Sequence, residues 1–215
     1  MDTNQIEVRP ILLSLMALVA TEIVLRFLAM DGRLSGMALT GVARLLESIL
    51  MILIVLRFGK GLQDIGLHRL TMGRGLKQGI AWSAGFGALT AIAAAVMIGA
   101  GLDPFAYIAV AMPPDSADII LLFCTAGVVG PVAEEIFFRG LMYGFFRRWG
   151  IVPALFLTTV VFVLAHSVTH PIPLPQIVGG FVFALAYEVS GSLITPIVIH
   201  ILGNSAIYAL SLLFS

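Results

Sequence analysis

Long apolar runs constrain this chain more than any other feature of its sequence. Several reach the roughly 20 residues that a helix needs to cross a hydrocarbon layer about 30 Å thick. Of the 215 residues, 60% are hydrophobic and only 11% are charged. Because soluble domains carry roughly 25% charged residues, this chain could not cover a globular surface with polar groups. We therefore expect an all-α integral membrane protein, since each helix satisfies its own backbone hydrogen bonds in lipid.

About seven transmembrane helices are predicted from these runs. They are Ile11–Met30, Met37–Leu56, Gln78–Ala100, Asp118–Arg148, Ile151–Val168, Gln176–Val189 and Leu193–Phe214. The first is too long for the apolar part of a cleavable signal peptide and is expected to span the membrane. We find no internal repeat and expect one domain over residues 1–215. Residues 118–214 are predicted to be its catalytic part.

Basic residues set the predicted orientation. The stretch from Arg57 to Lys77 holds five basic residues and one acid, whereas the loop from Gly101 to Asp118 holds three aspartates and no base. Positively charged loops stay on the cytoplasmic side, so the N-terminus is predicted to be cytoplasmic. The expected location is a prokaryotic inner membrane. The formal net charge is zero, which gives no indication of a nucleic acid partner.

Charged residues inside the predicted spans need partners, because a charge at the bilayer centre costs at least about 2.5–3.5 kcal/mol. Glu22 and Arg26 are spaced i,i+4, and Arg44 and Glu47 are spaced i,i+3. Each pair is expected to neutralise itself on one helix face. Glu188 lies near the end of its span and is expected to reach the interface.

The fourth span carries two adjacent acids and a base. Glu135 and Arg139 are spaced i,i+4 and are expected to form a salt bridge that holds the helix. Glu134 is rotated by about 100° from Glu135, so one partner cannot easily serve both acids. The later spans contain no basic residue that could pair with Glu134, but they do contain histidines.

These histidines fall at a similar depth on two other helices. We count depth from the cytoplasmic end of each helix at 1.5 Å per residue, which puts Glu134 at about 21 Å and His166 at about 22 Å. His200 and Asn204, spaced i,i+4, lie at about 15 and 21 Å by the same count. A lone buried histidine is usually a satisfied core residue. Four polar groups from three helices at matched depth instead indicate a functional site.

Hydrolysis by an activated water is the chemistry that this set of groups favours. A carboxylate and a histidine can act together on water as general base and acid, as expected for Glu134 and His166. A second histidine and an amide on one helix face are suitable donors to an oxyanion, as expected for His200 and Asn204. Such a reaction has no covalent intermediate.

Other hydrolytic chemistries fit the sequence less well. Glu134, His166 and His200 are all possible zinc ligands, but the H-E-x-x-H motif of an intramembrane zinc protease is absent. The G-x-S-x-G motif of a serine hydrolase is also absent, and the aspartates lie at the terminus or in loops. A metal-free, glutamate-based reaction without a cofactor is therefore expected.

Three motifs on separate spans resemble those of the CPBP family, which comprises the CAAX prenyl endopeptidases and the bacteriocin-processing or immunity proteins also called Abi. In order, they are Glu134-Glu135-x-x-x-Arg139, Phe162-x-x-x-His166 and His200-x-x-x-Asn204. The resemblance covers Gly130 to about Ala206. It implies an intramembrane endopeptidase in which Glu134 and His166 are catalytic. By the same resemblance, His200 and Asn204 form the oxyanion site, and Glu135, Arg139 and Phe162 are supporting residues.

The predicted substrate is a membrane-associated protein or peptide. Two other functions remain open. A non-catalytic scaffold or immunity protein of the same family would use the same helices to bind a partner in the bilayer. A proton-coupled transporter would use intramembrane Glu and His side chains as a proton relay.

Overall fold

A computed structural model describes residues 6–30, 35–166 and 173–214, and these parts of the chain are helical with no strand. The helices are α1 (Val8–Met30), α2 (Gly36–Phe58), α3 (Arg69–Gly99), α4 (Ser116–Leu122), α5 (Gly130–Glu135), α6 (Gly144–Phe146), α7 (Ile151–Ala165), α8 (Leu174–Ser190) and α9 (Ile194–Phe214). Short 3₁₀ turns occupy Leu62–Ile65, Phe105–Tyr107 and Arg147–Trp149. The segments Phe123–Val129 and Ile136–Tyr143 are π-helical and join α4, α5 and α6 into one long central helix.

The predicted all-α membrane fold is confirmed. Within the described ranges, five helices are long and apolar enough to cross a membrane: α1, α2, the stretch Leu62–Gly99, the central helix Ser116–Trp149, and α9. The helices α7 and α8 are apolar but have only 15 and 17 residues. Large apolar side chains cover the outside of the molecule, including Phe27, Leu89 and Phe156. Such side chains are suited to contact with the acyl chains of lipids.

Most predicted helix boundaries lie within three residues of the observed ones, whereas the start of α3 differs by nine. Helix α3 begins at Arg69 rather than Gln78, and the His68 Nδ1 atom accepts a hydrogen bond from a backbone N–H of its first turn. Hydropathy cannot detect this basic first part of the helix. The fifth span was expected to reach Val168, but α7 ends at Ala165 and the next residue is extended. Residues 167 and 168 lie outside the described part of the chain.

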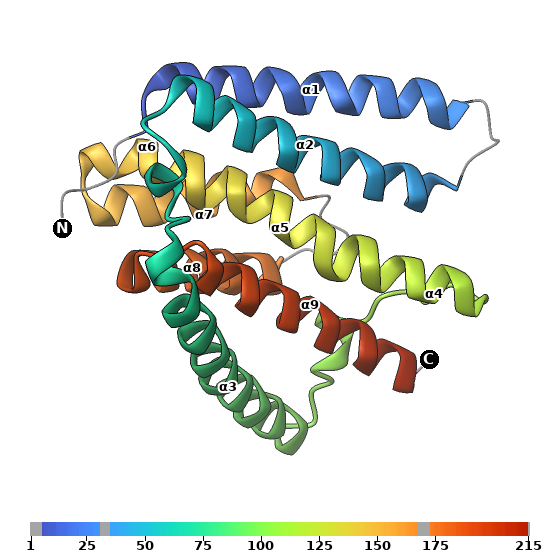
Figure 1. Cartoon of the computed structure of the whole chain (residues 1–215). Coiled ribbons are helices and arrows are strands. Elements are labelled where there is room, and N and C mark those ends of the chain that lie inside the picture. Colours follow the sequence, from blue (N-terminus) through green and yellow to red (C-terminus); the bar gives the residue numbers. More distant parts are fainter. Residues whose placement is uncertain (1–5, 31–34, 167–172, 215) are drawn as a thin grey trace.

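The helices are arranged around the central helix (Figure 1). Helix α1 packs on α2, and α2 packs on the central helix. On the other side of the central helix lies α9, which in turn packs against α3. Helices α7 and α8 pair with each other, and both contact the central helix. Every candidate catalytic residue therefore lies on the central helix, on a helix that contacts it, or, for His166, directly after one.

Two glycines bring α3 against α9. A Cβ atom on Gly79 would lie 2.6 Å from the Cβ atom of Val198, so only glycine permits this approach. One turn earlier, the Thr195 hydroxyl donates a hydrogen bond to the Gly75 carbonyl at 3.1 Å. Small residues let membrane helices pack closely in this way.

The intramembrane charges of α1 and α2 are paired between the helices. We expected Glu22 to bind Arg26 on its own helix, but Glu22 binds Arg44 of α2 at 2.8 Å. Arg44 also binds Glu47 at 2.5 Å, as its spacing predicted. The correction has a simple cause, because a helical repeat identifies which residues share a face but not which neighbouring helix that face meets.

Glu188 of α8 is bound at the basic end of the bundle. Its two carboxylate oxygens accept hydrogen bonds from the Arg147 guanidinium at 2.9 and 3.0 Å. The Tyr143 hydroxyl donates a further one at 2.8 Å. Glu188 therefore ties α8 to the end of the central helix.

Candidate active site

The central helix changes its winding just before the two glutamates. The Gly130 N–H bonds to the Thr125 carbonyl five residues back, which is the π-helical pattern. Pro131 is next and has no N–H, so it cannot bond to Ala126 in the same way. The Ala126 carbonyl instead accepts a hydrogen bond from the Asn204 side-chain nitrogen at 3.0 Å. The Gly-Pro pair thus creates the acceptor that binds Asn204.

Glu135 is fully buried and has two donors. Its Oε1 atom accepts from the Arg139 guanidinium at 2.9 Å, which is the salt bridge that the spacing predicted. The same oxygen lies 2.7 Å from Nδ1 of His200. Glu135 therefore also holds a histidine of α9, a contact that the sequence did not predict.

Arg139 is also fully buried, in a cage of aromatic rings. Its guanidinium carbon lies 4.6 Å from the ring centre of Phe162 and 5.2 Å from that of Phe183. A cation over an aromatic face is attracted by the ring's quadrupole. Its second terminal nitrogen donates to the Gly180 carbonyl of α8 at 3.0 Å. Phe162 therefore contacts the buried base, and its ring centre also lies 4.4 Å from that of the His166 imidazole.

Glu134 points toward two imidazole rings. Its Oε2 atom lies 3.6 Å from Nε2 of His166 and 3.8 Å from Nε2 of His200. Both distances exceed a hydrogen bond. The side chains of Glu134 and His166 are each 28% exposed, whereas that of His200 is 6% exposed. Two ring nitrogens thus converge on the Glu134 Oε2 atom, which is buried and has no hydrogen-bond partner among the described residues.

The partners at Nδ1 fix how both rings face Glu134. Nδ1 of His166 lies 2.7 Å from the Phe162 carbonyl, which can only accept, so this nitrogen carries a proton. Nδ1 of His200 meets the salt-bridged Glu135 carboxylate, which also only accepts. In the neutral form of each ring, Nε2 therefore presents a lone pair toward Glu134.

Asn204 of α9 binds the central helix. His200 and Asn204 lie four residues apart on α9, and the Asn204 side-chain nitrogen donates a hydrogen bond to the Ala126 carbonyl. An amide nitrogen carries two hydrogens, and this hydrogen bond uses one of them. This hydrogen bond holds the Asn204 side chain against the central helix, one turn of α9 after His200.

Helix α8 supplies two site residues that the sequence analysis missed. The Phe183 ring stacks on the His200 imidazole, with the ring centres 4.6 Å apart and the planes at 25°. Gly180 provides the carbonyl that binds Arg139, and a Cβ atom there would lie 3.2 Å from Phe162. Helix α8 carries none of the three motifs. Its only signal was the Gly179-Gly180 pair in a short apolar helix.

The part of the chain that the structure describes contains no group of three or more His, Cys, Asp or Glu side chains arranged to hold a metal ion.

Fold and site together define an integral membrane protein with a carboxylate–histidine centre on its helices. Residues 116–206 match the family described as Type II CAAX prenyl endopeptidase Rce1-like. This segment carries all three motifs, and its match supports the CAAX prenyl endopeptidase family that the motifs predicted.

A curated relative supports only a partial alignment. The chain is 32% identical over 88 residues to an uncharacterized 24.3 kDa protein of Escherichia coli. The aligned part covers 39% of this chain and 41% of that protein, so the match spans less than half of the relative's length. No solved structure matches the chain.

Proposed function

We propose that this protein is an intramembrane endopeptidase that hydrolyses peptide bonds without a metal ion. The observation that carries the proposal is the convergence of Glu134 with the Nε2 atoms of His166 and His200. The family match over residues 116–206 independently supports a CAAX-protease-like endopeptidase. Residues 118–214 are the proposed catalytic part of a single domain.

Glu134 and His166 are the proposed catalytic pair. Both side chains are partly exposed, and the Glu134 Oε2 atom is buried with no hydrogen-bond partner among the described residues, so the proposal places a water molecule at this oxygen. The Glu134 carboxylate would take a proton from this water as it attacks the substrate carbonyl carbon. The Glu134 carboxyl group would then pass this proton to the Nε2 lone pair of His166, and His166 would give it to the leaving amine as the C–N bond breaks, while its Nδ1–H stays bound to the Phe162 carbonyl.

His200 and Asn204 are the proposed oxyanion donors. For His200 to donate from Nε2, both ring nitrogens must carry protons, because Nδ1–H already bonds to Glu135. The Glu135 carboxylate would balance the charge of that ring. Asn204 would donate its second N–H, while the first holds the side chain on the central helix. Preorganised donors of this kind stabilise the tetrahedral oxygen without rearrangement.

The proposed substrate is a membrane-associated protein or peptide, cleaved close to the bilayer. The direct way to find it is to compare the protein termini in membranes of cells that carry either the wild-type protein or Glu134→Gln. New termini that appear only with the wild type identify candidate substrates. Purified wild-type protein in liposomes should then cleave a peptide that contains the site.

Two further measurements test the two other functions, the scaffold or immunity protein and the transporter. If Glu134→Gln restores the phenotype of a deletion strain and no terminus depends on Glu134, the protein acts as a scaffold or immunity protein. If proteoliposomes take up a solute in response to a proton gradient and cleave nothing, it is a transporter. Either result would overturn the proposed hydrolysis.

A further inference from the structure

Helix α9 carries two side-chain hydroxyl groups without a hydrogen-bond partner beside the candidate active site. They belong to Ser205 and Tyr208, which form no hydrogen bond among the described residues. The other polar side chains of α9 each have a partner; they are Thr195, His200, Asn204 and Ser211. An unpaired hydroxyl is costly in a hydrocarbon layer, where water does not replace the partner. The pair therefore indicates a ligand that forms hydrogen bonds.

Both residues face the central helix at its first π-helical segment. A Cβ atom on Gly127 would lie 3.6 Å from the Ser205 Oγ atom and 3.9 Å from two ring carbons of Tyr208. The Tyr208 ring also meets the Phe123 ring edge to face, with the ring centres 5.7 Å apart. Ser205 and Tyr208 are each half-buried. The Tyr208 ring is thus held against the central helix, while its hydroxyl has no partner there.

The two hydroxyls continue a row of polar groups that begins at the candidate active site. Asn204, a proposed oxyanion donor, directly precedes Ser205 and lies one turn before Tyr208. From Asn204 to Tyr208, α9 rises about 6 Å. The Tyr208 side chain also interacts electrostatically with the Glu134 carboxylate, so these two residues lie near each other.

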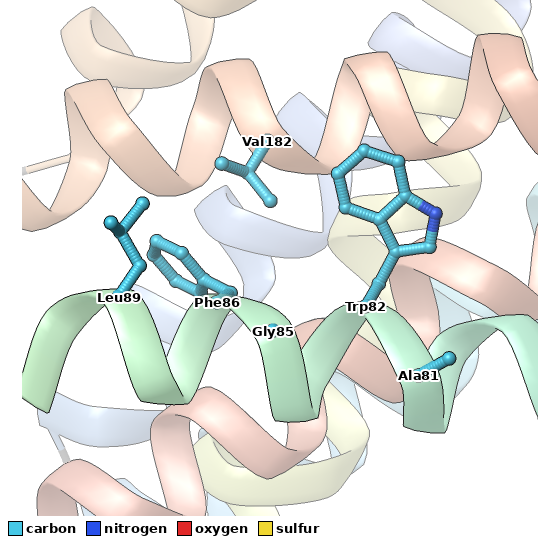
Figure 2. Close-up of a pocket in the computed structure, with 6 residues that line it drawn as sticks. All are labelled: Ala81, Trp82, Gly85, Phe86, Leu89 and Val182. Atoms are coloured by element: carbon cyan, nitrogen blue, oxygen red, sulfur yellow. The ribbon is translucent and has the colours of Figure 1, made fainter.

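The side of α9 that faces α3 is packed with apolar side chains. Trp82 and Phe86 of α3 pack against the buried cluster that contains Ile199 of α9. Figure 2 shows both rings beside Val182 of α8. The unpaired hydroxyls therefore lie on the side of α9 that carries His200 and Asn204 to the central helix.

A peptide substrate would bring main-chain groups that need such partners. A helix shields its carbonyl groups, so water can attack a peptide bond only where the segment is unwound. In lipid, the N–H and C=O groups of an unwound segment lose their partners, which is costly. An extended chain advances about 3.3 Å per residue, so the rise of about 6 Å from Asn204 to Tyr208 corresponds to about two residues.

We infer that Ser205 and Tyr208 bind the main chain of the substrate on one side of the scissile bond. Carbonyl groups two residues apart point to the same side of an extended strand. When the scissile carbonyl lies at Asn204, the Tyr208 hydroxyl donates to the carbonyl about two residues away. The Ser205 hydroxyl binds the main chain between them.

This inference rests on the proposed endopeptidase function and specifies its substrate class. Main-chain hydrogen bonds do not depend on side-chain identity. The substrate is therefore a membrane-associated segment that is extended near the cut, with no fixed side-chain motif on that side. Ser205 and Tyr208 position the substrate and do not touch the reacting atoms.

Kinetics of hydroxyl-deletion variants in liposomes test the inference, with a peptide that contains a Glu134-dependent cleavage site as the probe. Tyr208→Phe removes only the hydroxyl and keeps the ring beside Phe123. It should raise KM about 2- to 10-fold with kcat nearly unchanged, the effect of one hydrogen bond made equally in the bound and transition states. Ser205→Ala should change KM in the same direction. The matched control Tyr107→Phe removes a hydroxyl outside α9 and should leave KM and kcat unchanged.

Modified peptides locate the hydrogen bond with the wild-type protein. Replacing one amide near the cut with an alkene removes its carbonyl and keeps the extended shape. At the position about two residues from the cut, this change should raise KM as much as Tyr208→Phe does. Combining that peptide with Tyr208→Phe should cause no further loss, because both changes remove the same hydrogen bond.

Four results would overturn the inference. One is a KM for Tyr208→Phe and Ser205→Ala that equals that of Tyr107→Phe, while Glu134→Gln still abolishes cleavage. Another is a fall in kcat at unchanged KM, which would mean that the hydroxyls act on the reaction instead of on binding. A third is an alkene peptide series whose losses add to that of Tyr208→Phe at every position. The last, an absence of any Glu134-dependent cleavage, would overturn the proposed hydrolysis as well.

Discussion

Replacing Arg139 with methionine should destabilise the protein strongly, because it leaves the Glu135 charge buried. Both side chains are fully buried and 2.9 Å apart. Removing one partner of such a pair costs about 3–5 kcal/mol, since the remaining charge has lost its compensation. His200 remains as a donor to Glu135 but lacks the permanent charge of arginine. Methionine fills much of the aromatic cage, so the change tests charge more than volume.

Thermal unfolding in detergent measures this effect. For chains of 150–250 residues, about 1 kcal/mol corresponds to roughly 2–4 °C, so Arg139→Met should lower Tm by roughly 6–20 °C. The matched control is Arg147→Met, which breaks the Arg147–Glu188 pair. That pair is 20% and 23% exposed, so water can replace the lost partner. Its loss should cost on the order of 1 kcal/mol.

A second substitution separates charge from packing. Glu135→Gln in the Arg139→Met background removes the uncompensated charge and should recover much of the lost Tm. If the double variant is less stable than Arg139→Met, the buried charge is not the cause. A loss with Arg139→Met no larger than that with Arg147→Met would also refute the reasoning.

Three further predictions concern the helices around the site. Gly79→Leu should cost about 1–3 kcal/mol in thermal unfolding, because its Cβ would lie 2.6 Å from α9, whereas Gly87→Leu should cost little. Asn204→Ala should lower the cleavage rate about 10²- to 10³-fold if this amide is an oxyanion donor, and a loss below tenfold would contradict that role. Phe183→Leu should lower kcat roughly 2- to 10-fold with KM unchanged, because the ring orients His200. A change in KM alone would show that Phe183 acts on substrate binding instead.

Some features of the site could be predicted because they depend on spacing within one helix. The i,i+4 relation of Glu135 to Arg139 fixed their salt bridge, and the fixed rise per residue brought Glu134 and His166 to one depth. The later spans contain no lysine or arginine, which indicated histidines as the neighbours of Glu134. The depth estimate held even though His166 follows the last residue of α7 instead of continuing the helix.

Contacts between helices could not be predicted, because they depend on how each helix is rotated about its axis. Glu135 was expected to bind Arg139, and the structure shows that it also holds His200 of α9. For the same reason Glu22 binds Arg44 instead of Arg26. The part played by α8 was missed for a different reason. Apart from the Gly179-Gly180 pair, the sequence of this almost entirely apolar helix gives no indication that a glycine carbonyl and a phenylalanine ring belong to the site.

The most direct test of the proposed mechanism is the cleavage rate of Glu134→Gln in liposomes, measured against Glu22→Gln. Both changes replace an intramembrane carboxylate with an amide of the same shape, but Glu22 lies at the α1–α2 interface. General acid–base catalysis contributes about 10²- to 10⁴-fold, so Glu134→Gln should lower kcat by at least about 10²-fold at an unchanged Tm. Glu22→Gln should keep nearly the wild-type rate. A Glu134→Gln protein that cleaves within tenfold of the wild type would contradict the proposed role of this glutamate.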